Sequence, residues 1–524
     1  MKRRDFLGVA GGGIISSSIL KDIHRPMSNS WFDWFKTDTD RVLVIIQLEG
    51  GNDGLNTLIP LDQYDLYSKA RSSVALPAAK ILSLNTTNKT GFHPALDEIR
   101  GLYHEGKIKF IQSVGYPSPN YSHFRSTDIW MSGSDADEIL SSGWAGRYLQ
   151  YEYPNFPTGF PNEDMPDPLS VEIGYGQSLT FQGPATSMSV TIADPASFNK
   201  LIEGIETPLP NDLYGEKLGY VRLIRRQSNS YGERMKLAYS KSQNKVSYPD
   251  HNLADQLKIV ARLIAGGLKS RVYKVSISGF DNHANQVLEN DHTQGEHHNL
   301  LKSISSGVNA FLKDLEALGL QDRVIGMTIS EFGRRIISNA SRGTDHGAAA
   351  PLMLFGHAID GGNLLGQNPT IPKEAKDYDN IPMQYDFRSV YGSILEEWFC
   401  VNQADVKSAL TKTYQKLPII KSSFGCLTTP THEETEKAGT NILSVSPNPF
   451  VNKISIKLLS DGTYSMVSIF NPGGQIIENI HTGKLTPGWN TLDWNSENLP
   501  TGNYYVRFQQ GAAQQVKLIA KVRD

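Results

Sequence analysis

The sequence predicts an α/β protein with a mostly parallel sheet flanked by helices, followed by a small all-β immunoglobulin-like sandwich. Three observations predict this class. Continuous apolar runs rich in β-branched residues recur along the chain, as in strands buried on both faces of a parallel sheet. Segments with a helical apolar stripe lie between them, and strands alternating with helices indicate a parallel sheet. Beyond residue 440, short segments alternate apolar and polar residues between glycine turns, which is typical of a sandwich.

Five apolar runs are the predicted strands of the α/β domain, at residues 41–48, 107–115, 271–280, 323–330 and 351–356. Between the third and fourth runs, residues 296–320 carry an apolar stripe at helical spacing, and Gly319 is expected to end that helix. Residues 251–270 predict a similar helix. Ligands of parallel sheets bind beyond the carboxyl ends of the strands, so the polar residues that follow these runs are candidates for function.

The composition indicates a soluble globular chain of more than one domain. The chain has 524 residues, 39% of them hydrophobic and 20% charged, with a formal net charge of −3. This length exceeds a single simple core, and a chain without a basic excess is a poor nucleic-acid binder. The only cysteines are Cys400 and Cys426. Two cysteines exclude a disulfide scaffold and a cysteine-based zinc finger, and their pairing with each other stays open.

Residues 1–30 have the features of an export signal. Lys2, Arg3 and Arg4 precede a weakly apolar, glycine-rich segment that is too short to span a bilayer. The order Arg-Arg-Asp-Phe-Leu resembles a twin-arginine signal, which exports folded proteins, and an ordinary secretory signal is the alternative. No later stretch is apolar and long enough for a transmembrane helix. We therefore expect the mature protein to leave the cytoplasm.

Acidic and histidine residues gather where the predicted strands end or start. Six of them form the predicted metal-binding set: Asp53, Asp281, His283, Glu331, Asp345 and His346. Carboxylates combined with imidazoles suit Zn²⁺ or Mn²⁺ better than Ca²⁺, so we expect one or two such ions. Taken alone, Asp53 is better explained by an ordinary Asn-Asp-Gly turn. Four repetitions favour a metal site, which requires these side chains to meet in one pocket.

Histidines are dense in the loop after the third run, where four of the chain's 13 lie within residues 283–298. A solvated histidine-rich loop is the alternative to a metal site here. His297 and His298 open the predicted helix and are expected at its cap or on the surface.

Five motifs carry a family resemblance. They are, in order, GGNDGLNTLIP (50–60), YSHFRSTDIW (121–130), SGFDNHANQ (278–286), TISEFGRR (328–335) and GTDHGAAAPLMLFG (343–356). Together they resemble the bacterial domain-of-unknown-function family DUF1501, which is grouped with the alkaline phosphatase and sulfatase superfamily. The resemblance implies an alkaline-phosphatase-like fold over residues 41–426 and two metals at the ends of parallel strands.

The superfamily resemblance also implies roles. Asp53 resembles the acid after the first strand, Asp281 and His283 an Asp and a His of one metal site, and His346 the histidine that completes it. Ser330-Glu331-Phe332-Gly333 resembles a Ser-Asp-His-Gly element. Phe332 stands where that element has a histidine ligand, which puts the second metal in question.

The nucleophile of the superfamily is a Ser, Thr or modified Cys at a helix start, where amide groups favour an anion. We predict Ser122 for this role, ahead of Ser118 and Ser126, with Arg125 to stabilise negative charge. Arg334 and Arg335 are alternatives for the cation, and each of these arginines is explained equally well as a surface charge. The sulfatase motif Cys-x-Pro-x-Arg does not occur, which argues against a formylglycine sulfatase.

Residues 427–440 are polar and aperiodic and predict a linker, and residues 441–524 predict the sandwich. VSPNPF (445–450), LPTGNYYVRF (499–508) and the terminal QQVKLIAKVRD resemble the C-terminal sorting domain of the type IX secretion system of Bacteroidetes-type bacteria. The resemblance implies that the secretion machinery is a partner and that the protein passes the periplasm to the cell surface or the medium. A sandwich used for adhesion is the alternative.

These features predict an exported, metal-dependent hydrolase of phosphate or sulfate esters, acting on a small anionic or glycan-linked ester. A catalytically decayed surface binding protein on the same scaffold is the alternative, and Phe332 favours it. A carbohydrate-processing enzyme with paired carboxylates is a third possibility, which the histidines disfavour.

Overall fold

The computed structural model describes residues 40–197, 209–210, 213–426, 443–460, 462, 464–470, 476–496, 499–510 and 513–523. The predicted export signal (1–30) and linker (427–440) lie outside these residues. The chain divides into two compact units, one of residues 37–428 and one that contains residues 429–524. Each unit is described separately.

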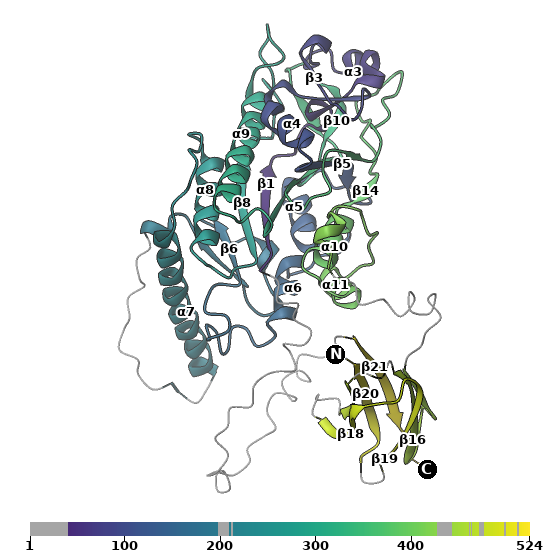
Figure 1. The fold of residues 1–524 in the computed structure, drawn as a ribbon. Helices are drawn as coiled ribbons and strands as arrows, with labels where there is room; N and C mark the ends of the chain where they lie inside the picture. Colours follow the sequence, from purple (N-terminus) through teal and green to yellow (C-terminus); the bar gives the residue numbers. More distant parts are fainter. Residues whose placement is uncertain are drawn as a thin grey trace. The chain divides into compact units, whose positions relative to one another are not determined.

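The larger unit is built on a nine-stranded sheet in the order β13-β5-β12-β9-β1-β8-β6-β7, with β14 paired to β5 (Figure 1). The strands are β1 (Val42–Glu49), β5 (Ile108–Gly115), β6 (Ser170–Ile173), β7 (Ser189–Ile192), β8 (Val272–Ser278), β9 (Val324–Ser330), β12 (Ala350–Gly356), β13 (Leu364–Leu365) and β14 (Tyr385–Asp386). β7, β6, β8, β1 and β9 run parallel, which confirms the predicted mostly parallel sheet.

Among the described strands of this sheet, β12 is the antiparallel one. It pairs antiparallel with both β9 and β5. Its first residues therefore lie at the same edge as the carboxyl ends of β1, β8 and β9. A loop that enters β12 and the loops that leave those strands consequently meet at one edge.

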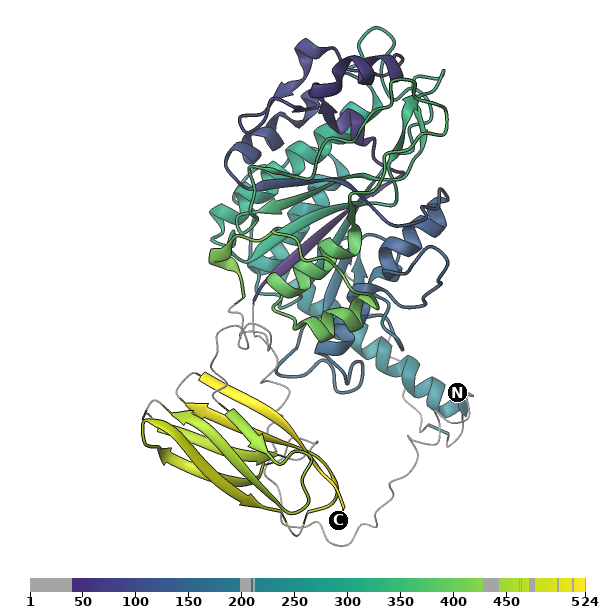
Figure 2. The same cartoon turned by 90° about the vertical axis from the view of Figure 1, so that its right-hand side faces the viewer.

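Helices cover both faces of the sheet, as the two views show (Figures 1 and 2). Side chains of α4 (Asp97–His104), α7 (Leu213–Lys241), α8 (Asn252–Ala265) and α9 (Glu296–Ala317) pack into one apolar core. Side chains of α5 (His123–Ser132), α6 (Trp144–Glu152), α10 (Phe387–Glu397) and α11 (Gln403–Leu410) pack into the other. Alternate residues of β1 enter the two cores, Val44 on one face and Ile45 on the other, because successive side chains of a strand point to opposite faces. Gly319 follows α9 with φ +71°, as its predicted role requires.

Short elements surround the carboxyl edge of the sheet. They are α2 (Gly54–Thr57), α3 (Tyr64–Ala70), a sheet of β2 (Leu58–Pro60), β4 (Thr90–Phe92) and β3 (Leu82–Ser83), and the hairpin of β10 (Arg334–Ser338) and β11 (Thr344–His346). Single 3₁₀ turns are η2 (Leu61–Gln63), η3 (Ala78–Lys80), η4 (Pro94–Leu96), η5 (Leu179–Phe181), η6 (Pro195–Ser197) and η7 (Ser422–Phe424).

The cysteine pairing that the sequence left open is a disulfide. Cys400 and Cys426 are bonded, with their Cα atoms 5.4 Å apart. The bond ties the segment after α10 to the last described residue of the larger unit. Among the described residues, no helix combines the length and the apolar character that crossing a membrane requires.

The smaller unit is the predicted sandwich. A sheet of β15 (Leu443–Ser446), β16 (Lys453–Ser460) and β19 (Gly488–Asn495) and a sheet of β18 (Ile476–Lys484), β17 (Tyr464–Phe470), β20 (Gly502–Gln510) and β21 (Ala513–Lys521) contain antiparallel strand pairs. Side chains of both sheets, including Ile456, Trp494, Val467 and Phe508, share one apolar core. The predicted all-β class of the tail is confirmed.

Candidate metal centre

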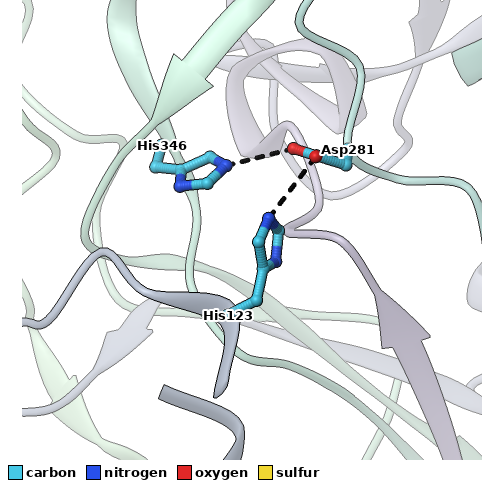
Figure 3. Close-up of side chains that lie close together, drawn as sticks. All are labelled: His123, Asp281 and His346. Carbon is cyan, nitrogen blue, oxygen red and sulfur yellow. Dashed lines mark hydrogen bonds and ion pairs between the residues drawn. The ribbon is translucent and has the colours of Figure 1, made fainter. Parts of the chain in front are cut away.

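Loops from distant parts of the chain bring one carboxylate and three imidazoles together at the carboxyl edge of the sheet. Asp281 follows β8, His346 ends β11 and His123 begins α5 (Figure 3). Ligand atoms of these three residues lie within 4.8 Å of one another. His346 Nε2 is 3.0 Å from Asp281 Oδ1, and His123 Nε2 is 3.4 Å from Asp281 Oδ2.

His283, two residues after Asp281, completes the group. Its Nε2 lies 3.1 Å from Asp281 Oδ1 and 2.9 Å from His346 Nε2. The structure therefore brings together Asp281, His283 and His346, as the metal-site interpretation requires. We call the four residues His123, Asp281, His283 and His346 the Asp281 cluster.

Each histidine of the cluster has an acceptor at its Nδ1. For His346 the acceptor is the carbonyl oxygen of Tyr121 at 2.8 Å. For His283 it is Asp345 Oδ1 at 3.0 Å, and for His123 it is Glu331 Oε1 at 3.0 Å. A carbonyl or carboxylate oxygen accepts a hydrogen bond, so in each ring Nδ1 carries the hydrogen. The neutral form of each ring then has a lone pair on Nε2.

These lone pairs point at a carboxylate and at one another, which is unfavourable unless a positive charge lies among them. Burial raises the pKa of Asp281, but the hydrogen bond from Arg334 and the contact with His346 outweigh this effect and lower the pKa to about 2. The carboxylate is therefore ionised. Burial lowers the pKa of His346, which disfavours an extra proton on its ring. A divalent cation would balance the carboxylate and accept the lone pairs of His123 and His346, whose ligand atoms lie within 4.8 Å of one another and of Asp281, and His283 Nε2 lies beside His346 and Asp281.

The hydrogen bonds made by the second nitrogen of each ring also fit a metal site. Metal-binding histidines usually donate their other ring N–H to a carboxylate or a backbone carbonyl, as all three do here. The ligand atoms on Asp281, His283 and His346 are 2.9–3.1 Å apart. Ligands of one tetrahedral ion, bonded at about 2.0–2.1 Å, are about 3.4 Å apart, so small movements suffice to bind it.

Glu331 and Asp345, predicted as ligands, lie behind the histidines and orient them. Glu331 is 5% exposed, and its Oε1 accepts from His123 and, at 2.7 Å, from the amide of Gly50. Its Oε2 is buried and has no hydrogen-bond partner in the described part of the chain. Asp345 Oδ1 accepts from His283 and, at 3.3 Å, from Asn339 Nδ2. Burial raises the pKa of Asp345, whereas the hydrogen bond with His283 lowers it, with a net lowering.

Phe332 forms an apolar wall beside the cluster. It is 1% exposed, and its ring centre lies 4.9 Å from that of His123 and 4.5 Å from that of His346. It occupies the position where the family resemblance places a histidine ligand, so at this position the chain offers packing in place of a metal bond.

Asp53, the sixth predicted ligand, is held in another set of contacts. It is 3% exposed, forms an ion pair with Arg71 and accepts from Gln286 Nε2 at 2.5 Å. Its other oxygen accepts from the amide of Asn56 and so caps α2. These contacts occupy its carboxylate.

The predicted catalytic residues also have defined positions. Ser122 is the exposed N-cap of α5, directly before His123. Arg125 donates to the backbone carbonyls of Asp135, Ala136 and Glu138.

The two alternative arginines are engaged as well. Arg334 is buried and holds Asp281 at 2.8 Å. Arg335 donates to the carbonyls of His346 and Asp377 at 3.1 and 2.8 Å.

The sequence analysis missed His123 as a ligand candidate. Its position in the motif YSHFRSTDIW, directly after the proposed nucleophile Ser122, could have identified it. The expectation that His297 lies at a cap or on the surface is wrong: it is 1% exposed, its Nε2 contacts Asn52 Oδ1 at 3.1 Å, and burial lowers its pKa to about 4.

A cavity of about 770 Å³ opens beside the Asp281 cluster. His123, Asp281 and Glu331 line one part of it, and residues of β1, β6 and β8 line another. A molecule bound in the cavity therefore lies next to the candidate metal ligands.

Sequence comparisons identify two segments of the chain. Residues 223–384, which contain Asp281, His283, Glu331, Asp345 and His346, match the family model described as "Protein of unknown function (DUF1501)". The DUF1501 resemblance is confirmed. Residues 444–521 match the model of a secretion system C-terminal sorting domain, which confirms the predicted sorting domain and indicates export to the cell surface or the medium. No curated protein matches the chain.

Several solved structures resemble the fold of this chain. One is a protein of the alkaline phosphatase superfamily from Vibrio parahaemolyticus, with 8% identity, a TM-score of 0.31, and coverage of 93% of this chain and 83% of that one. Another is the sulfatase PsFucS1 from Pseudoalteromonas sp., with 10% identity, a TM-score of 0.34, and coverage of 87% and 84%. A third is the phosphonate monoester hydrolase SpPMH from Silicibacter pomeroyi, with 10% identity, a TM-score of 0.32, and coverage of 92% and 88%. Similarity at this level carries no conclusion about activity.

Proposed function

We propose that this protein is an exported hydrolase of phosphate or sulfate esters that works with one divalent metal ion held by the Asp281 cluster. One observation carries the proposal: three Nε2 lone pairs, each fixed by an acceptor at Nδ1, converge on one ionised carboxylate. Three nitrogen donors and one oxygen favour Zn²⁺, with Mn²⁺ as the next choice, over Mg²⁺ or Ca²⁺.

A bound divalent ion supplies Lewis-acid chemistry, polarising an ester oxygen and lowering the pKa of a water. The protein's own residues prepare the site. Asp345, Glu331 and the Tyr121 carbonyl keep the imidazoles in the ligating tautomer. Phe332 packs against two of the rings and excludes water from their far side.

Ser122 remains our proposed nucleophile, because it caps α5 immediately before the ligand His123. The free amides at the start of that helix favour negative charge. Arg125 binds backbone carbonyls, so its proposed contribution to charge stabilisation acts through the position of α5.

The export route is part of the proposal. The sorting-domain match supports recognition by the type IX secretion machinery after passage through the periplasm. We assign residues 1–30 as a twin-arginine-like signal, residues 41–426 as the hydrolase domain, residues 427–440 as the linker and residues 441–524 as the sorting domain.

The test combines metal analysis with turnover. Full-length protein purified without chelators is analysed for metals by mass spectrometry and assayed with p-nitrophenyl phosphate and p-nitrophenyl sulfate. We expect about one zinc or manganese per chain and hydrolysis of at least one ester. His346→Ala and His283→Ala should lose both metal and activity, and Ser122→Ala should lose activity alone. Metal-free, inactive wild-type protein contradicts the proposal.

A binding protein on a decayed scaffold is the second candidate, and Phe332 is the observation that favours it. Phe332 packs its ring where the superfamily resemblance has a histidine ligand, so a second metal ion would lack that ligand. Bound metal without hydrolysis of either ester would select this candidate.

A further inference from the structure

The cavity beside the Asp281 cluster has a floor whose chemistry changes along the strands. On one face of β1, Ile45 is apolar, Gln47 is an amide and Glu49 is an acid, in that order toward the carboxyl end. Gln47 and Glu49 line the cavity, as do Lys274 and Ser276 of the neighbouring β8. The sheet thus presents polar groups where a substrate of the proposed hydrolase lies.

The cavity contains more carboxylates than cations. Five acids line it: Glu49, Asp128, Glu172, Asp281 and Glu331. Lys274 is its lysine, and this side chain is neutralised by Glu172, whose Oε1 lies 3.1 Å from Nζ. Asp281 and Glu331 are engaged with Arg334 and the histidines.

Glu49 and Asp128 are the other two of the five acids. Neither side chain forms a hydrogen bond or an ion pair within the residues that the structure describes. Both line the cavity, Glu49 from the end of β1 and Asp128 from α5. Two carboxylates without partners attract a cation into the cavity and repel an anion.

A buried amide oxygen also lacks a partner. Gln47 is 6% exposed and lines the cavity floor, and its Oε1 has no hydrogen-bond partner among the residues that the structure describes. Buried amides are normally hydrogen-bonded, so a ligand that supplies a donor would satisfy this oxygen.

Two aromatic rings line the same cavity and are open to solvent. Phe124 is 87% exposed and Tyr175 is 99% exposed. Aromatic faces attract ammonium groups through the ring quadrupole. Carboxylates, an unpaired amide and aromatic rings together fit one chemistry, a donor-bearing cation.

We propose that this cavity binds a positively charged amino group of the substrate, so that the preferred esters are those of amino alcohols. This inference rests on the proposed function, because the Asp281 cluster would hold the ester while the cavity holds the alcohol part. A neutral polyol can donate hydrogen bonds to the amide oxygen and to the two carboxylates but carries no charge to balance theirs, and an anionic group is repelled by them.

Binding of three matched phosphonates to the zinc-loaded full chain, measured by calorimetry, tests the inference without turnover. The probes are 2-aminoethylphosphonate, 2-hydroxyethylphosphonate and 3-phosphonopropionate, which place a cation, a hydroxyl or a carboxylate at a similar distance from phosphorus. We expect the amine to bind about five- to tenfold more tightly than the hydroxyl compound, and the carboxylate to bind most weakly.

Variants assign the preference to the cavity. Glu49→Gln with Asp128→Asn keeps the shape of both side chains and should reduce the preference for the amine to less than about twofold. Glu163→Gln is the matched control, since this exposed acid precedes β6 and so lies toward the amino-terminal edge of the sheet. It should leave the order of affinities unchanged. Equal affinities, tighter binding of the hydroxyl or carboxylate probe, or no binding of any probe overturns the inference.

Failure of the inference and failure of the proposed function give different results. Metal content and hydrolysis of p-nitrophenyl esters report the proposed function, because those esters carry no amino group. Hydrolysis without preference for the amine rejects the cavity's assignment alone. Preference for the amine without any hydrolysis rejects the enzyme and leaves an amine-binding site.

Discussion

Replacing Asp345 by asparagine removes the anionic acceptor that fixes one histidine of the Asp281 cluster. Asp345 Oδ1 lies 3.0 Å from His283 Nδ1 and 3.3 Å from Asn339 Nδ2. Asparagine has the same shape, but its amide can turn its NH₂ toward His283. That contact stabilises the tautomer with its hydrogen on Nε2, which cannot bind a metal.

The exposure of the acceptor sets the expected loss. Removing such an outer contact typically costs 10- to 100-fold in metal affinity. Asp345 is 47% exposed, so water can replace its contact, and we expect about a tenfold weaker zinc affinity, or about 1.4 kcal/mol. Glu331 is 5% exposed and water cannot replace it, so Glu331→Gln should reach about 100-fold.

Zinc competition against a chromogenic chelator of known affinity measures both losses, with circular dichroism to check folding. Asp377→Asn is the control, because the described contact of Asp377 is made by its backbone carbonyl. The reasoning about tautomers is refuted if His283→Ala loses zinc while neither acceptor variant does. A larger loss for Asp345→Asn than for Glu331→Gln refutes the argument from burial.

Three further predictions concern stability. Burial lowers the pKa of His297 to about 4, so between pH 7 and pH 5 the unfolded chain binds a proton that the folded protein does not. Stability should therefore fall by about 2 kcal/mol at this residue, and urea denaturation of His297→Gln should show a correspondingly smaller loss on acidification. Phe332→Ala should lower the free energy of unfolding by about 3 kcal/mol, measured the same way, because a fully buried ring is removed; an unchanged midpoint argues against the described packing. Cys400→Ser with Cys426→Ser opens a loop of 26 residues and should cost about 3.5 kcal/mol, seen as a melting temperature about 4 °C lower; reductant should have no effect on this variant.

The sequence could predict the site residues that follow strands, because the carboxyl ends of parallel strands lie at one edge of the sheet. Asp281 follows β8 and Glu331 follows β9, and both lie at the site, as polar residues after buried parallel strands should. The position of His346 at this edge depends on a strand direction that the sequence does not reveal. It precedes a strand, and a parallel strand would have carried it to the opposite edge. Because β12 is antiparallel, its start lies with the other strands' ends. The apolar run 351–356 specifies a buried strand but not its direction.

His123 and Asp53 show what local sequence leaves out. His123 is 158 positions before Asp281 in the chain and begins a helix, so no strand rule places it at the site. Asp53 does follow a strand at the correct edge, but Arg71 and Gln286 occupy its carboxylate. Which carboxylates have partners depends on contacts between distant segments, and these contacts decide which acids remain for a metal or a substrate.

Arg334 illustrates how such contacts define the chemistry of the site. Its Nε donates to Gly51 O at 2.8 Å, its Nη1 to Thr344 O at 2.7 Å, and its Nη2 to the carbonyl oxygens of Gly50 and Phe280 as well as to Asp281 Oδ1. A guanidinium has five N–H donors, and these contacts use those of Nε and Nη2 and one of the two on Nη1. Because Arg334 is 1% exposed, the guanidinium is not open to a substrate oxyanion. The arginine instead joins the loops after β1 and β8 to the β10–β11 hairpin and keeps the Asp281 carboxylate ionised. The positive charge that a phosphate or sulfate ester needs at this site must therefore come mainly from the metal, and the metal depends on the three acceptors that hold the imidazoles.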